Sequence, residues 1–165
     1  MKKTVADYRL PRYAELPNVG LYLDQVAKYI NGFLEPIGCS EITTSMISNY
    51  VKKKIIDNPI KKQYYREQIA YLIFIAMAKS VLSLEDIKLM IHLQKMTYMP
   101  EKAYNYFVEE LENVLKIVFE GGTDYKELGS DRTREKTMLR NTVIAISHKV
   151  YLDLVFAEVR AEEEL

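Results

Sequence analysis

Short hydrogen-bonding side chains followed by lysines form a polar stripe within residues 42–56, the segment best suited to recognising a ligand. If a helix begins at Thr43, the members of the stripe recur at three- and four-residue steps. They are Ser45, Ser48, Asn49, Lys52 and Lys53. Asparagine can form two hydrogen bonds to adenine, serine can bond several bases, and lysine attracts phosphate groups in any sequence. The order therefore favours a DNA recognition helix, whose N-terminal residues reach base edges. An ordinary solvated helix face is the alternative.

Other reactive side chains indicate no catalytic or metal site. The sequence contains no nucleophile–base motif, no phosphate-binding glycine loop and no dinucleotide-binding fingerprint. The glutamates between residues 109 and 120 accompany no paired histidine, and His92 and His148 are isolated from each other. Cys39 is the single cysteine, which excludes a disulfide framework and is typical of a reduced, cytoplasmic protein. We therefore expect no enzyme activity, no metal and no cofactor.

Composition and charge place the chain among globular proteins. The 165 residues are 48% hydrophobic and 28% charged, and no apolar run approaches the ~20 residues of a membrane span. The net charge is zero, which weighs mildly against a nucleic-acid partner. Positive charge is nevertheless concentrated in residues 43–68, which hold six basic and two acidic residues. This asymmetry predicts a basic docking face on a neutral body.

Apolar periodicity predicts a mainly α-helical chain. An arm over residues 8–20 should be extended, because it contains two Leu-Pro pairs and proline disfavours helix at the preceding residue. The predicted helices cover 22–34, 43–54, 66–79, 83–96, 101–120 and 131–160. Thr43 and Ser83 are expected helix caps, and Ser130 or Asp131 is expected to cap the last helix.

The segment from about residue 20 to 95 resembles the MerR-type winged helix-turn-helix family. The family pattern V-S-x-x-T-L-R-Y-Y-E-x-x-G-L-I aligns with Ile42-Thr43, Ile47-Ser48-Asn49-Tyr50 and Ile55-Ile56. Its wing exit aligns with Tyr64-Tyr65-Arg66-Glu67-Gln68-Ile69, and its G-F-S-L-E-E-I with the run from Val81 to Ile87. The chain is also similar to an uncharacterised bacterial family with the N-terminal signature L-P-R-x-x-E-L-P followed by L-Y-x-D-Q-V, here at residues 10–17 and 21–26.

This resemblance implies a set of DNA contacts and three departures from the family. The implied contacts are Ser45, Ser48, Asn49, Tyr50, Lys52 and Lys53 on the helix and Lys61 and Lys62 on the wing. Lys54 replaces the glycine at the helix exit, so a left-handed backbone there would be strained. Ser48 replaces an arginine, and residues 57–63 leave room for a tight hairpin at most. These departures predict that each module binds DNA with low affinity.

The resemblance also divides the chain. Residues 1–97 should form the arm and a winged helix-turn-helix module with a very short wing. Residues 98–165 should form a C-terminal α-helical hairpin that makes a homodimer or senses an effector. A monomer whose two long helices pack on each other and on the module is the alternative.

The predicted function is a cytoplasmic transcriptional regulator that reads a half-site of double-stranded DNA with helix 43–54. Two alternatives remain: a protein-interaction adaptor on the same scaffold, and a small-molecule sensor. The aromatic residues that could line a sensor pocket are Tyr98, Tyr104, Tyr106, Phe107, Phe119 and Tyr125, although aromatics at helical spacing are more often core.

Overall fold

Helices dominate the protein, as the periodicity predicts. The computed structural model describes residues 5–125 and 132–163. Its α-helices are α2 (Leu23–Leu34), α3 (Thr44–Lys52), α4 (Arg66–Ala78), α5 (Leu84–Thr97), α6 (Pro100–Phe119) and α7 (Arg134–Glu162). Short 3-10 helices cover Tyr13–Glu15 and Glu35–Ile37. In the described ranges strand pairing is limited to isolated bridges, Leu21 with Tyr64 and Ile60 with Gln63. Within the same ranges no helix is long and apolar enough to cross a membrane.

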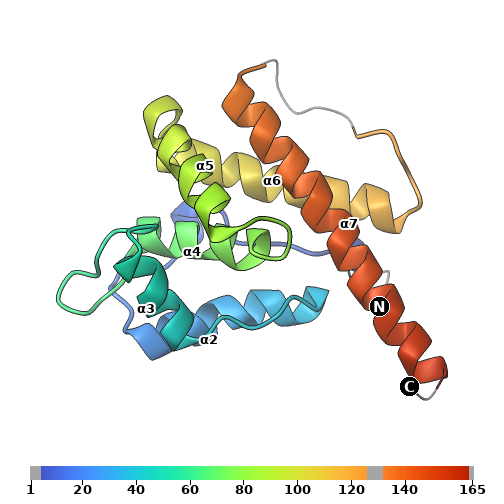
Figure 1. Cartoon of the computed structure of the whole chain (residues 1–165), viewed down its shortest axis with the longest axis horizontal. Helices are drawn as coiled ribbons and strands as arrows, with labels where there is room; N and C mark the ends of the chain where they lie inside the picture. Colours follow the sequence, from blue (N-terminus) through green and yellow to red (C-terminus); the bar gives the residue numbers. More distant parts are fainter. Residues whose placement is uncertain (1–4, 126–131, 164–165) are drawn as a thin grey trace.

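Helix α4 lies at the centre because it is apolar on all sides. Ten of its residues are buried, from Gln68 to Ala78, whereas α2 buries one stripe that includes Val26, Ile30 and Leu34. A helix without a polar face must be covered on every side. The partners of α4 are α2 on one flank and α6 and α7 on the other (Figure 1).

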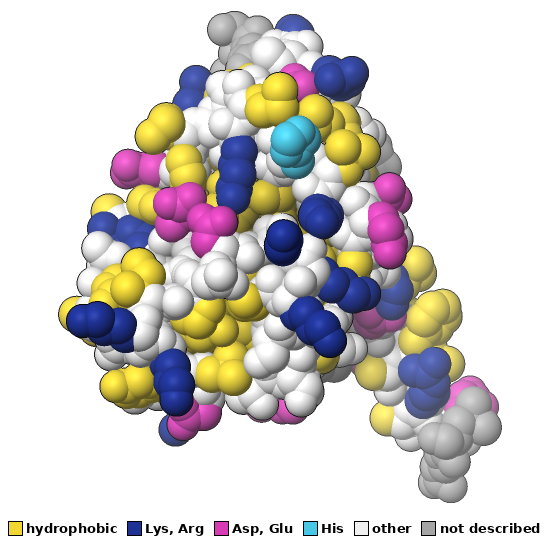
Figure 2. Space-filling model, turned by 60° about the vertical axis from the view of Figure 1, so that its left-hand side comes forward, with side chains coloured by type: hydrophobic (Ala, Val, Ile, Leu, Met, Phe, Trp, Pro, Cys, Tyr) yellow, Lys and Arg dark blue, Asp and Glu magenta, His cyan; other side chains and the backbone are white. Residues whose placement is uncertain are grey.

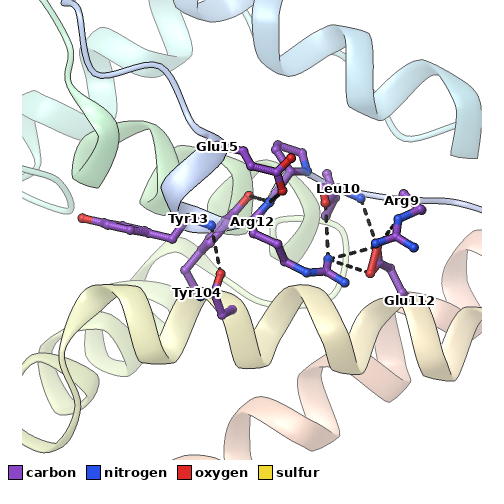
Figure 3. A network of polar contacts seen from close by, with 9 residues as sticks. Arg9, Leu10, Arg12, Tyr13, Glu15, Tyr104 and Glu112 are labelled. Carbon is purple, nitrogen blue, oxygen red and sulfur yellow. Dashed lines mark hydrogen bonds and ion pairs between the residues drawn. The ribbon is translucent and has the colours of Figure 1, made fainter.

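The N-terminal arm is extended apart from its one-turn 3-10 helix, and it lies along α6. The leucines of both Leu-Pro pairs are buried, Leu10 at 4% and Leu16 at 1% exposure. Arg12 reaches Glu112 of α6 with 2.7 Å between Nη1 and Oε2, and Tyr104 donates a 2.8 Å hydrogen bond to the carbonyl of residue 11 (Figure 3). The leucine–proline–arginine run therefore fastens the arm to the C-terminal half.

Helices α6 and α7 pack along each other and enclose an ion pair. The carboxylate of Glu110 is fully buried, and Arg140 of α7 lies 3.3 Å from it. Thr133 caps α7 by accepting a hydrogen bond from the Lys136 amide. The cap is therefore Thr133 rather than Ser130 or Asp131, the two predicted caps, which lie outside the described residues.

One hydrophobic core connects the two halves of the chain. It runs from Val5 in the arm to Val150 in α7 and includes residues on both sides of the predicted boundary at 97/98. The end of α7 extends beyond this body (Figure 1). The surface around α3 is therefore held by a rigid support that spans almost the whole chain.

Candidate nucleic-acid interface

Two hydrogen bonds from a single side chain fix the start of α3. The amide of Asn31 in α2 donates to the carbonyl of Ile42 at 2.9 Å and accepts from the Ile42 N–H at 2.8 Å. Thr43 Oγ1 then accepts from the Met46 N–H at 3.1 Å, which satisfies one of the free amides of the first turn. The predicted cap at Thr43 is confirmed.

Helix α3 turns its polar stripe outward. Ser45, Ser48, Lys52 and Lys53 are exposed and Asn49 is half-buried. These five side chains therefore share one accessible face, as their spacing predicts.

Tyr50 does not belong to that accessible face, so its assignment as a DNA contact was wrong. Its side chain is 3% exposed and lies in the core with Ile47. The physical reason is helical phase: a residue three positions after Ile47 points to the same side of the helix. Burial also raises the pKa of the Tyr50 hydroxyl.

A Schellman motif ends α3 at a lysine in place of the usual glycine. The Ile55 N–H bonds the Tyr50 carbonyl at 2.9 Å, and the Lys54 N–H bonds the Val51 carbonyl at 2.9 Å. Lys54 has φ 58°, in the left-handed region. Ile55 and Tyr50 are both buried, which provides the apolar contact that accompanies this motif. The strain expected at Lys54 is therefore present.

A two-residue turn stands in the place of the predicted wing. Ile60 and Gln63 exchange two backbone hydrogen bonds of 2.9 Å each. Between them Lys61 has φ 50° and Lys62 has φ 67°, the pattern of a type I′ turn. Leu21 and Tyr64 pair next to the turn and tie it to the start of α2. Both lysines are exposed at the tip, so the prediction of a tight hairpin is confirmed.

Five exposed lysines surround the outer end of α3, and their charge is not neutralised locally. They are Lys52, Lys53, Lys54, Lys61 and Lys62. Among the described residues none forms an ion pair with them. The neighbouring Asp57 pairs instead with Lys95 of α5, 3.8 Å away. Figure 2 shows basic side chains scattered between hydrophobic and acidic ones on this side of the molecule, which agrees with the zero net charge.

Sequence reasoning expected a tight hairpin but not its type I′ turn, and it reached the left-handed end of α3 only through the resemblance. Type I′ turns and Schellman motifs are usually marked by glycine or asparagine, and lysines occupy all three left-handed positions here. The alignment of Lys54 with a family glycine was the one available signal. No comparable signal marked Lys61 and Lys62.

The fold and this surface define a mainly helical protein that presents a short polar helix beside a lysine-tipped turn. A family model described as a domain of unknown function, DUF1836, matches residues 11–107, more than half of the chain. The chain therefore belongs to this family. The matched region contains the arm from residue 11 onward, the α3 surface and the first part of α6. No curated protein and no solved structure matches the chain.

Proposed function

We propose that the protein is a cytoplasmic DNA-binding regulator of the winged helix-turn-helix type that reads double-stranded DNA with the outer face of α3. The observation that carries this proposal is the presence of lysine at three left-handed positions, 54, 61 and 62. A non-glycine residue in this conformation costs about 1–2 kcal/mol. Backbone strain of this kind clusters at functional sites, because a useful side chain can offset its cost. Five exposed, unneutralised lysines at one end of α3 suit a phosphate backbone.

In the proposed complex the two ends of α3 make different contacts with the DNA. Ser45 and Ser48 face base edges near the start of the helix, and Asn49 supplies the two-bond contact to adenine. Lys52 to Lys54 follow at the other end, and the 61–62 turn extends the basic surface along the DNA backbone. Phosphate contacts fix the register and base contacts provide the sequence preference.

A second copy of the chain would join through the projecting end of α7. Leu152, Phe156 and Val159 recur there at four- and three-residue steps and are 45%, 50% and 43% exposed. These residues form one apolar stripe on a helix. In an antiparallel pair centred on Phe156, Lys149, which pairs with Asp153 of its own helix at 2.6 Å, would also face Glu163 of the second copy. Two copies would present two α3 helices to two half-sites.

The test of DNA binding is selection of bound fragments from a random pool, followed by gel retardation at several salt concentrations. We expect an enriched motif, and Asn49→Ala should reduce discrimination at one position by about 1–3 kcal/mol. The double variant Lys52→Gln/Lys53→Gln should weaken binding to all sequences and lower the slope against log salt by about 2. The control Lys88→Gln/Lys116→Gln removes two exposed charges from α5 and α6 and should change neither. Absence of both an enriched motif and retardation at low salt would refute the proposal and favour a protein-interaction adaptor.

The dimer is tested separately by light scattering. The wild-type chain should have twice the mass of a monomer, and Phe156→Asp should shift it to the monomer while its helical circular dichroism is retained. Phe156→Leu is the matched control and should remain dimeric. A monomeric wild-type chain at high protein concentration would exclude this mode of association.

A further inference from the structure

A cavity of about 350 Å³ lies between α4, α5, α6 and α7, away from the α3 surface. Its apolar wall combines the rings of Phe74 and Phe107, which meet edge to face at 5.2 Å, with Ile91, Met138 and Leu139. Of the six aromatics that the sequence suggested for a pocket, Tyr98, Tyr104, Tyr106 and Phe107 line it. Phe119 and Tyr125 do not, since their rings contact Tyr151 and His148. The volume falls in the range of small-molecule sites, about 300–1,000 Å³.

The polar groups of the wall are largely satisfied by one another. The Tyr71 hydroxyl donates to Gln94 Oε1 at 2.7 Å, and Gln94 Nε2 donates to the Tyr98 carbonyl at 2.7 Å. The Tyr104 hydroxyl donates to the carbonyl of residue 11 in the arm. Because these groups already have partners, they leave an apolar interior, and water in such a space would find few hydrogen bonds. An apolar body is therefore the best occupant of the interior.

Two lysines lie at the edge of the cavity. Lys102 lies over the Tyr98 ring with its Nζ 5.1 Å from the ring centre, and Lys136 lies over the Tyr106 ring at 5.0 Å. Lys102 is exposed, so its ammonium group can meet solvent while its stem lines the cavity. Lys136 is half-buried and also belongs to the lining. Glu135 is the acid of the lining, and Arg134 lies 3.3 Å from its carboxylate. The exposed Lys102 therefore supplies positive charge at the edge.

We propose that this cavity binds a small amphipathic anion, with a hydrocarbon or aromatic body and a carboxylate head. The body fills the space between Phe74, Phe107 and Leu139, and the head lies at the edge near Lys102 and Lys136. Burial of apolar surface provides most of the affinity. The lysines discriminate against neutral and cationic molecules of the same length, because those heads gain no attraction at the positive edge.

The test uses isothermal titration calorimetry of the full chain with decanoate, decanol and decylammonium, below the micelle concentrations of the two ions and the solubility limit of decanol. We expect decanoate to bind most tightly and decylammonium least. Lys102→Gln/Lys136→Gln should weaken decanoate about fivefold, the effect of two partly exposed charge contacts, and leave decanol unchanged. Lys88→Gln/Lys116→Gln is the charge-matched control away from the cavity and should bind decanoate as the wild type does.

A second variant tests the location of the site. Ala103 is half-buried on α6 and lines the cavity, so Ala103→Phe places a ring in the space and should abolish binding of decanoate and decanol alike. Thermal melting of Ala103→Phe is measured in parallel. If this variant fails to fold, the double variant Lys102→Gln/Lys136→Gln tests the proposal. Failure of all three compounds to bind the wild type would overturn the proposal. So would equal binding of decanoate and decylammonium, or wild-type affinity in a folded Ala103→Phe chain. None of these results depends on DNA binding.

Discussion

Lys54→Gly should stabilise the protein, because it removes a side chain from a left-handed position without disturbing a contact. Lys54 has φ 58° and is exposed, and its N–H bonds the Val51 carbonyl in the Schellman motif. Glycine is the residue preferred at this position of the motif. The backbone hydrogen bonds and the buried contact of Ile55 with the rest of the core should persist in the variant.

The expected magnitude is a difference of two opposing contributions. Relief of the left-handed conformation contributes about 1–2 kcal/mol. The extra conformational freedom of glycine in the unfolded chain costs about 0.5–1 kcal/mol. The free energy of unfolding should therefore rise by about 0.5–1 kcal/mol. For a chain of this size that corresponds to an increase in Tm of about 1–4 °C.

Urea unfolding followed by circular dichroism measures this effect, and Lys53→Gly provides the matched control. Lys53 carries the same side chain one residue earlier but has φ −79°, which any residue adopts. Its replacement loses the same charge and relieves no strain, so the free energy of unfolding should fall by about 0.5–1 kcal/mol. If the two variants shift stability in the same direction, the reasoning about strain is refuted.

Two further predictions concern buried ionisable groups. Arg140→Met should lower the free energy of unfolding by about 3 kcal/mol in a chemical denaturation experiment, because it removes the ion pair that Arg140 forms with the buried Glu110 carboxylate. Adding Glu110→Leu should recover most of this loss, and a double variant as unstable as the single one would contradict the account. Burial raises the pKa of the Cys39 thiol from 9.0 to about 11. Iodoacetamide at pH 8 should therefore alkylate the native protein about a hundredfold more slowly than the urea-unfolded protein, since the thiolate is the reactive form. Equal rates in a mass-spectrometric time course would show that the thiol is not held in its neutral form.

Local patterns in the sequence were sufficient to place most helices. The repeat of apolar residues along α2, α4 and α6 and the caps at Thr43 and Ser83 depend on neighbours a few residues away, and all of these are confirmed. The same locality explains the polar face of α3. The side of α3 on which a residue lies follows from its spacing along the chain from the buried Ile47.

The error at Tyr50 shows the limit of an alignment. Its match to a family tyrosine placed this residue at the DNA, whereas its spacing from Ile47 puts it on the buried side of the helix. The structure agrees with the spacing, because an aromatic ring stabilises the folded state more when it is buried in the core than when it is exposed.

The roles of the acidic residues on α6 were decided by tertiary structure. The sequence shows Glu110 and Glu112 as two nearby glutamates on one helix, without distinction. Glu110 meets Arg140 of α7 in the interior, whereas Glu112 meets Arg12 of the arm. These partners lie 30 and 100 residues away along the chain, so no local pattern could identify them.

The sequence by itself determined the helices, their caps and the polar face of α3, because each depends on contacts within a few residues. Tertiary structure decided the left-handed turn at Lys61 and Lys62, which is tied down by the pairing of Leu21 with Tyr64. It also decided the cavity, whose wall is assembled from four helices that are separated in sequence. An enclosed space arises only when distant segments pack together, and for that reason the cavity appears first in the folded chain.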